Sequence, residues 1–290
     1  MVARCEPDTP ILDALALSDD PAGSPTRIAP SLGRPEARRG RAIPWRRVGG
    51  RVQTGRMCGR FANDAKIDEL IQEFVAEGGD YRDWRPQFSI APTEVVPIVR
   101  ERKNSETGEV RRSVDPAVWN FRPSFMKESK RPQFNTRIET VATNGLWKGA
   151  FASSRCLVPM RGYYEWTGEP GSKQAWFLHS DQPLLAAAGI YTARKVGEEW
   201  EVSTSIITRE ARDASGEVHD RMPVFLDRAA WNDYLAPVKL DDPGKAEMIA
   251  LMTAESERVA ASISNYEVDR RVNNSRAVDP ADPTLIDPLG

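Results

Sequence analysis

The residue pair Met57-Cys58 carries the most reactive chemistry that the sequence offers. A methionine directly before a cysteine is a possible initiator, and its removal would leave Cys58 as an N-terminal residue. Such a cysteine has an amine and a thiol on adjacent carbons, with reference pKa values of about 8 and about 8.5. Both groups are therefore partly deprotonated near neutrality, and together they can capture an aldehyde. An internal cysteine cannot form an imine, because its nitrogen is an amide.

Three further clusters of polar residues follow along the chain, and the first covers residues 135–140 (NTRIET). It places a neutral amide, Asn135, two residues from the guanidinium of Arg137. The amide suits hydrogen bonding to a reacting group, and the guanidinium suits bidentate binding of phosphate. A loop with a helix N-cap explains the same residue types, so both interpretations remain open.

The second cluster covers residues 162–166 (GYYEW). Alternation along a strand places Tyr164 and Trp166 on one face, and Glu165 with Tyr163 on the other. A glutamate surrounded by aromatic rings is desolvated, which raises its pKa and suits it to proton transfer near neutrality. The alternative is a surface glutamate at a sheet edge.

The third cluster, residues 219–224 (HDRMPV), is a polar loop that enters an apolar strand. His219 is one of two histidines in the chain and is a candidate proton carrier at neutral pH. The other, His179, ends an apolar strand, so we expect it to be structural. Cys156 is flanked by apolar residues, and we expect it in the core.

Composition and charge narrow the class of protein. The chain has 40% hydrophobic and 28% charged residues, as globular proteins do. No apolar run approaches the roughly 18 to 20 residues of a membrane span, so we expect an intracellular protein without membrane contact. The three cysteines and two histidines show no metal-ligand spacing, and we predict neither a metal nor a cofactor.

The first 56 residues differ from the rest of the chain. They contain ten arginines, six acidic residues, seven prolines and six glycines, and no lysine. Such a segment cannot bury enough apolar surface to offset chain entropy, so we expect residues 1–56 to be disordered. We predict a mis-called start or a removable leader, with a functional basic tail as the alternative. The domain itself is expected over residues 57–290, whose net charge is −6 because the extension carries +4 of the total of −2.

The spacing of apolar residues predicts the elements that position these clusters. A helical repeat begins after a possible N-cap at Asp64 and stops at Gly78-Gly79. Later strand-like segments are joined by short turns, which favours antiparallel pairing. We therefore predict a single α+β domain built on a mixed or antiparallel curved sheet with flanking helices. The predicted strands cover residues 94–100, 110–121, 155–166, 174–179, 184–192, 200–208 and 262–272, and further helices cover residues 144–152, 227–235 and 243–253.

Taken together, the motifs MCGRF, NTRIET, GYYEW and HDRMPV resemble those of the SRAP family, named for SOS response-associated peptidase. They occur in the family's order, and the resemblance runs from Cys58 to about Pro288. The family is known for covalent attachment to abasic sites in single-stranded DNA. The resemblance therefore implies a DNA-repair protein whose partner is single-stranded DNA containing abasic sites. We expect a monomer in the bacterial cytoplasm that joins the nucleoid during repair.

The resemblance also implies roles for individual residues. Cys58 would form an imine with the sugar aldehyde and then close a thiazolidine through its thiol, while Asn135 would hold the adduct by hydrogen bonds. Glu165 would move protons during imine formation and ring closure, and His219 would assist opening of the deoxyribose ring. The residues predicted to bind DNA are Arg60, Arg137, Arg221 and Trp119.

Two departures and two alternatives accompany the resemblance. Residues 119–125 (WNFRPSF) differ from the family's usual Trp-Gly before a proline and an aromatic, which bears on base stacking. If the extension stays attached, the nitrogen of Cys58 is an amide and cannot crosslink.

A thiol peptidase that cuts its own leader before Cys58, using His219 and Asn135, is one alternative function. A noncatalytic binder of modified DNA is the other.

Overall fold

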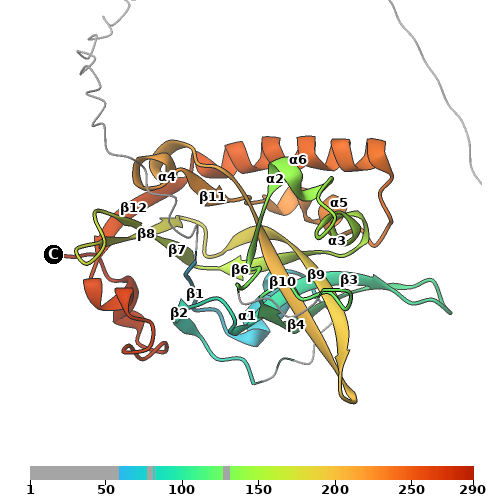
Figure 1. Cartoon of the computed structure of the whole chain (residues 1–290), viewed down its shortest axis with the longest axis horizontal. Helices are drawn as coiled ribbons and strands as arrows, with labels where there is room; N and C mark the ends of the chain where they lie inside the picture. The colour runs from blue at the N-terminus through green and yellow to red at the C-terminus, as the bar shows by residue number, and fades with distance from the viewer. Residues whose placement is uncertain (1–58, 77–80, 82, 127–130) are drawn as a thin grey trace, which may run out of the picture. The chain divides into compact units, whose positions relative to one another are not determined.

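The structure, a computed structural model, describes residues 59–76, 81, 83–126 and 131–290. Within these ranges the chain forms a five-stranded and a seven-stranded sheet with helices packed around them (Figure 1). The predicted α+β class with curved sheets is confirmed. Cys58, the predicted disordered segment 1–56 and the predicted helix stop at Gly78-Gly79 lie outside the described residues.

The five-stranded sheet is antiparallel throughout, in the order β12-β8-β7-β1-β2. Phe61 of β1 pairs with Tyr163 of β7 on one side and with Ile90 of β2 on the other. The first described residues therefore lead directly into an interior strand of this sheet. Its strands are β1 (Phe61–Asn63), β2 (Gln87–Ile90), β7 (Gly162–Thr167), β8 (Gln174–Ser180) and β12 (Ile263–Val268).

The seven-stranded sheet curls into a partial barrel, in the order β11-β10-β4-β3-β6-β9, because β9 pairs back onto β10. The long strand β10 pairs with β9 and then β11 along one edge. Along its other edge it pairs, in parallel, with β4 and then β5. The strands are β3 (Val95–Lys103), β4 (Val110–Trp119), β5 (Asn135–Arg137), β6 (Arg155–Met160), β9 (Leu185–Val196), β10 (Glu199–Glu210) and β11 (Arg221–Pro223).

The single strand predicted over residues 155–166 is wrong, because this segment forms β6 and β7, which belong to different sheets. The chain bends at Arg161. Its backbone N–H donates to the carbonyl of Ala62 in β1, and its guanidinium donates to the carbonyl of Gln182. Buried residues continue on both sides of the bend, so the apolar pattern gives no sign of it.

The predicted helices are present with shifted ends, and two short helices, residues 138–141 and 213–218, were not predicted. The N-cap of the first helix is Lys66 rather than Asp64, because the Asn63 side chain already accepts a hydrogen bond from the N–H of Ala65. Helix α6 extends past the predicted end, and its last turns bury the polar residues Glu255 and Ser256, which conceal the apolar repeat. The helices are α1 (Ile67–Glu73), α2 (Ile138–Val141), α3 (Lys148–Ser153), α4 (Asp213–Val218), α5 (Trp231–Leu235) and α6 (Asp242–Ala260), with 3-10 turns η1 (Arg228–Ala230), η2 (Arg270–Asn273) and η3 (Pro283–Ile286).

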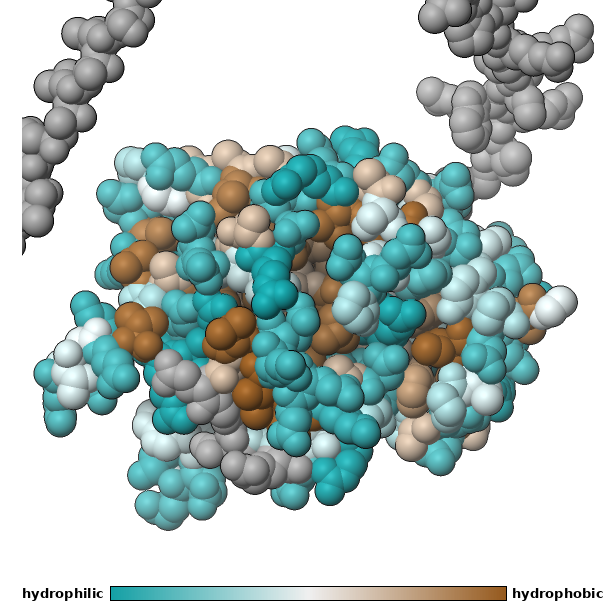
Figure 2. Space-filling model, turned by 180° about the vertical axis from the view of Figure 1, so that it is seen from behind, coloured by the Kyte–Doolittle hydropathy of each residue, from teal (hydrophilic) through white to brown (hydrophobic). Residues whose placement is uncertain are grey.

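The predicted last strand, residues 262–272, ends at Val268. The Asp269 side chain accepts a hydrogen bond from the N–H of Arg271, which starts the turn η2. No helix among the described residues is long and apolar enough to cross a membrane. The face of the molecule seen in Figure 2 is mostly hydrophilic, with apolar residues in small scattered groups.

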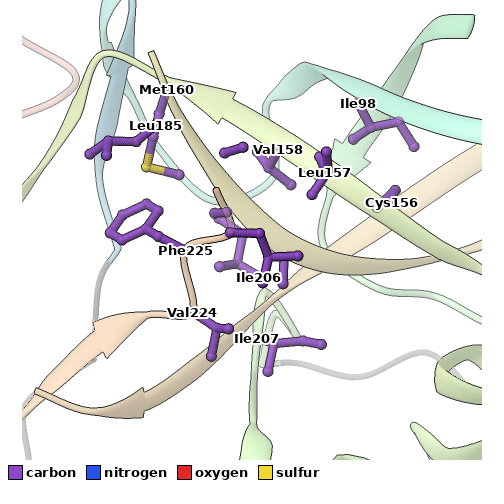
Figure 3. Packing of buried hydrophobic residues seen from close by; sticks show 14 of the residues in the cluster. Ile98, Cys156, Leu157, Val158, Met160, Leu185, Ile206, Ile207, Val224 and Phe225 are labelled. Carbon is purple, nitrogen blue, oxygen red and sulfur yellow. The ribbon is translucent and has the colours of Figure 1, made fainter. Parts of the chain in front are cut away.

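Two apolar clusters stabilise the fold. The larger one fills the barrel with side chains from β3, β6, β9, β10 and the segment after β11 (Figure 3). Cys156 is among them and is fully buried, which confirms its predicted place in the core. The smaller cluster lies against the other sheet and consists of Ala62, Tyr164, Ala175, Phe177, Val268, Val272 and Leu285.

Burial makes Cys156 chemically inert. Desolvation raises the pKa of its thiol to about 12, despite a contact of 3.5 Å with the Thr204 hydroxyl. Because the thiolate is the reactive form, iodoacetamide at pH about 8 should leave Cys156 unmodified in the native protein. Peptide mass mapping checks this, with the same reaction in denaturant as the positive control. Native-state alkylation of Cys156 at the denatured rate would contradict the prediction.

Candidate functional site

Glu165 of β7 and His219, in the segment between α4 and β11, lie side by side. Glu165 is only 2% exposed, which excludes the surface position. Its Oε2 lies 4.0 Å from Nε2 of His219. On the same face of β7, the Tyr163 hydroxyl lies 2.8 Å from the Ser215 hydroxyl of α4. Two contacts thus hold β7 against the segment that ends in His219.

The predicted alternation in β7 is confirmed. Tyr163 packs in the larger apolar cluster with Phe225, whereas Tyr164 packs in the smaller one. Trp166 lies on the Tyr164 side, with its ring stacked 6.3 Å from the Tyr164 ring. Glu165 therefore points toward the side of the sheet where His219 lies.

Hydrogen bonding indicates which ring nitrogen of a neutral His219 carries the proton. Its Nδ1 accepts a hydrogen bond of 3.0 Å from the backbone N–H of Arg221. A neutral imidazole carries one proton, so that proton lies on Nε2, which faces Glu165. Nδ1 also lies 3.1 Å from Oδ1 of Asp220. The arrangement gives a buried carboxylate next to an imidazole N–H, a pair suited to moving protons.

Arg221 joins the NTRIET and HDRMPV motifs. Its guanidinium donates to both carboxylate oxygens of Glu139, at 2.6 and 3.0 Å, and to the carbonyl of Thr208 at 2.7 Å. Glu139 lies in the first turn of α2, directly after β5. One bidentate pair therefore connects α2, β10 and β11. Because Arg221 is 9% exposed and engaged by Glu139, its charge is largely neutralised within the protein.

Asn135 and Arg137 share one face of β5. Asn135 pairs with Ile206, and Arg137 pairs with Thr208, whereas Thr136 between them is buried. Thr208 is flanked on its other side by Pro223 of β11, so the two motifs border the same point of β10. Asn135 is half-buried and Arg137 is exposed, and within the described residues the Arg137 side chain makes no hydrogen bond.

Arg60 is buried rather than displayed to solvent. It is 8% exposed, and its Nη1 donates to the Ser89 hydroxyl and to the carbonyl of Val272, each at 2.9 Å. Desolvation lowers the pKa of its guanidinium, and the charge of Glu94 opposes that shift. The guanidinium also lies 5.9 Å from the centre of the Trp166 ring. These contacts give Arg60 a place inside the sheet, next to its smaller apolar cluster.

Trp119 also lies inside the protein. It is 1% exposed, and its ring meets Phe61 edge-on at 4.9 Å. Its Nε1 donates to the carbonyl of Phe134 at 2.9 Å. In this arrangement neither Trp119 nor Arg60 offers an exposed face to DNA. Of the four predicted DNA-binding side chains, Arg137 is the exposed one.

The start of β1 leads to Glu165. The N–H of Tyr164 donates to the carbonyl of Arg60 at 3.0 Å, and Phe61 pairs with Tyr163. Continuing this antiparallel register sets Gly59 across from Glu165. Cys58 lies outside the described residues, and it is bonded to Gly59.

Two residues of the site were not singled out from the sequence. The sequence held one sign of Glu139. It is an acidic residue inside the NTRIET motif, and its charge is opposite to that of the arginine in the HDRMPV motif. Ser215 had none, because its contact with Tyr163 spans 52 positions of the chain. Among the described residues, no group of three or more His, Cys, Asp or Glu side chains could hold a metal ion.

The fold and the four linked motifs together define a class of protein. Comparison with known proteins gives that class its name. The chain belongs to the SRAP family, whose model, described as SOS response associated peptidase (SRAP), matches residues 57–275. It is 27% identical over 235 residues to the abasic site processing protein YoqW of Bacillus subtilis, covering 77% of this chain and 97% of that one. It is 29% identical over 186 residues to the abasic site processing protein YedK of Escherichia coli, covering 62% and 79%. A crystal structure of a Bacteroides thetaiotaomicron protein shares the fold, with a TM-score of 0.63 and 21% identity over 80% of this chain and 100% of that one.

Glu139→Gln tests the link between the motifs. The substitution keeps the shape but removes the charge that Arg221 binds, so we expect a loss of about 1–2 kcal/mol of unfolding free energy, since Glu139 is half exposed. Burial alone would raise the pKa of Glu139, but the Arg221 hydrogen bonds outweigh it and the pKa lies below its usual value. The stabilisation that the Glu139–Arg221 pair gives is therefore fully present above the pKa of glutamate in the unfolded chain, about 4.3. It is lost as the pH falls through the lower pKa of Glu139 in the folded protein.

Urea denaturation at neutral and acidic pH measures this difference. Glu257→Gln is the matched control, because Glu257 makes a single bond of 3.2 Å to Arg209 and is 57% exposed. We expect the control to lose less than about 0.5 kcal/mol. Equal losses in the two variants would show that the Glu139 pair does not stabilise the site.

Proposed function

We propose that this protein attaches covalently to abasic sites in single-stranded DNA, with Cys58 as its N-terminal residue. The observation that carries the proposal is the pair of Glu165 and His219, 4.0 Å apart, beside the strand that leads from Gly59. The relatives named abasic site processing proteins support the substrate. Action as a monomer, in the bacterial cytoplasm and at the nucleoid during repair, belongs to the same proposal.

The proposed reaction balances without a cofactor. The sugar of an abasic site opens from its ring form to an aldehyde. The Cys58 amine adds to the aldehyde carbon, and loss of water gives an imine. The thiol sulfur then adds to the imine carbon while its proton passes to the nitrogen, which closes a five-membered thiazolidine. The sum is one aminothiol plus one aldehyde giving one thiazolidine and one water, and positioned proton carriers are all it needs.

The site supplies those proton carriers. In the proposal, Glu165 takes a proton from the attacking amine and returns it to the departing hydroxyl. The Nε2–H of His219 donates to the sugar ring oxygen as the ring opens. Asn135 holds the adduct by hydrogen bonds.

The arginines have different tasks in the proposal. Exposed Arg137 binds a phosphate, so DNA binding should weaken as salt rises. Arg221, bound to Glu139, positions the backbone N–H that fixes His219. Buried Arg60 and Trp119 shape the site from within rather than contact DNA.

The experiment compares three proteins on single-stranded DNA with one abasic site. They are the chain starting at Met57, the full 290-residue chain and Cys58→Ser of the shorter chain. On a denaturing gel only the first should give a stable adduct, because only it can expose the Cys58 amine. Cys156→Ser in the shorter chain is the matched control and should still crosslink, since that thiol is buried. Absence of an adduct from the shorter chain would rule out the proposal.

The same preparations separate the two alternatives. Intact mass of the full chain identifies self-cleavage if a species begins at Cys58 and is missing from the full-length Cys58→Ser protein. Salt-sensitive DNA binding in every form, with no adduct in any, identifies a noncatalytic binder.

A further inference from the structure

A hollow of about 360 Å³ opens at the end of the barrel where β4 and β10 separate. These strands pair only through Val118 with Ser203 and Trp119 with Thr204, and beyond these pairs they diverge. The hollow lies between them, lined by residues of β3, β4 and β10. Mouths of β-barrels are a frequent place for small-molecule sites.

The hollow is separate from the candidate site. Trp200, near the start of β10, lines the hollow, whereas Thr208, near the end of the same strand, contacts Arg221. Eight residues at about 3.3 Å each put these positions about 26 Å apart. The residues around the hollow take no part in the function proposed above.

The first feature of the hollow is an exposed indole. Trp200 is 70% exposed, more than is usual for the largest apolar side chain. Pro116, Val118 and Val202 form apolar walls beside it. An indole face over apolar walls is a surface on which a planar ring can stack.

The second feature is a fixed acceptor. Asp115 is 5% exposed, and its Oδ2 accepts hydrogen bonds of 2.7 Å from Arg100 Nε and of 2.7 Å from the Ser113 hydroxyl. Within the described residues its other oxygen, Oδ1, accepts no hydrogen bond. The Arg100 guanidinium is itself held over the Tyr191 ring, at 4.8 Å. The hollow thus contains an almost buried carboxylate, fixed on one side, with one oxygen left to accept.

Burial alone would raise the pKa of Asp115, but the hydrogen bonds from Ser113 and Arg100 outweigh it, and the pKa lies below its usual value. The carboxylate is therefore ionised at neutral pH and can only accept hydrogen bonds. A ligand at this point must carry a donor.

The third feature is a cation at the rim. Arg102 is 55% exposed at its side chain, and its Nη2 lies 3.9 Å from Asp115 Oδ2, too far for a hydrogen bond. The other carboxylate at the hollow, Glu201, is shared by Arg122 at 3.3 Å and Arg194 at 2.9 Å. Two arginines and two carboxylates line the hollow, and Arg122 and Arg194 add two cations beside it, so the rim favours an anionic group.

We infer that this hollow binds a nucleotide that carries an amino group on its base. The base stacks on Trp200, its amino group donates to Asp115 Oδ1, and its phosphate binds Arg102. Carboxylates accept from the amino group of cytosine, whereas thymine has none, so cytosine is preferred over thymine. Stacking on an aromatic ring next to a cation is the usual way to hold an unpaired base. The nucleotide is either free or part of an unpaired strand, since both present the same groups.

Titration of the chain starting at Met57, followed by tryptophan fluorescence and calorimetry, tests the inference. The probes are deoxycytidine monophosphate, thymidine monophosphate, deoxycytidine and a deoxycytidine decamer with intact bases. We expect Trp200→Ala to weaken binding of the cytosine probes about tenfold or more. Arg102→Ala should weaken the monophosphate and leave the nucleoside unchanged. Lys195→Ala is the matched control, because Lys195 pairs with Trp200 across the hairpin and is also exposed.

Each probe has an outcome that supports or overturns the inference. Binding of the monophosphate assigns a free nucleotide, and binding of the decamer alone, weakened by Trp200→Ala, assigns an unpaired strand. Equal binding of the cytosine and thymine monophosphates would overturn the role of Asp115 and with it the inference. No binding of any probe, or binding that Trp200→Ala leaves unchanged, would also overturn it. None of these readouts requires an abasic site, so failure here leaves the proposed function standing.

Discussion

Glu165→Gln is expected to slow adduct formation by about 10²- to 10⁴-fold, the range that general acid–base catalysis contributes. The amide has nearly the same shape as the carboxylate but cannot take and return a proton. Glu165 is 2% exposed and lies 4.0 Å from His219, so water has little room to substitute for it. The rate of adduct formation is measured in the chain starting at Met57. Single-turnover time courses with an abasic oligonucleotide are resolved on denaturing gels at several pH values.

The control separates chemistry from folding. Glu267→Gln changes an exposed carboxylate on β12 of the same sheet and should react at the wild-type rate. Thermal unfolding of both variants shows whether the fold is retained. If folded Glu165→Gln reacts within about threefold of wild type, with an unchanged pH profile, Glu165 is a structural carboxylate and protons move by another route.

The motifs could be recognised in the sequence more easily than the bounds of the strands and helices that carry them. Alternation in β7 was visible because one aromatic residue, Tyr164, packs in a separate cluster from Tyr163. In β6 every residue is buried, so no alternation exists to mark its end at Met160. Strands β1 and β5 are three residues long, too short to show a period, and neighbouring strands hold them in place.

The candidate site required contacts between distant segments. Arg221 and Glu139 are 82 positions apart, and a sequence pattern shows neither their pairing nor its effect on the charge of Arg221. Trp119 was predicted to bind DNA from its residue type, but its partners Phe61 and Phe134 enclose it. Residue type indicated which chemistry is available, and the topology decided which side chains are exposed to perform it.

Arg155→Met is expected to lower the free energy of unfolding by about 3–5 kcal/mol, because each buried carbonyl left without a donor costs about 1–3 kcal/mol. Arg155 is 3% exposed and is surrounded by backbone carbonyls rather than by a carboxylate. Most belong to the ends of α3 and α5, where the last carbonyls lack partners within the helix, and one, Val238, lies just beyond α5. The accepting carbonyls, with their distances from Arg155, are Tyr234 (2.7 Å), Phe151 (3.0 Å), Ala152 (2.8 Å), Ala236 (2.6 Å) and Val238 (3.2 Å).

Methionine fills much of the same volume but donates no hydrogen bond, so the carbonyls of Phe151 and Tyr234, one at each helix end, would lose the donor that Arg155 supplies. Urea denaturation measures the loss, and at about 2–4 °C per kcal/mol the melting temperature should fall by about 6–20 °C. Arg155→Lys should fall between wild type and methionine, because an ammonium has three donors and cannot span both helix ends. Arg276→Met, at an exposed arginine, should change the free energy by less than about 0.5 kcal/mol. If Arg155→Met lowered the free energy of unfolding no more than Arg276→Met does, other donors would bind the carbonyls at the two helix ends. Arg155 would then not be the residue that holds α3 and α5 against the barrel.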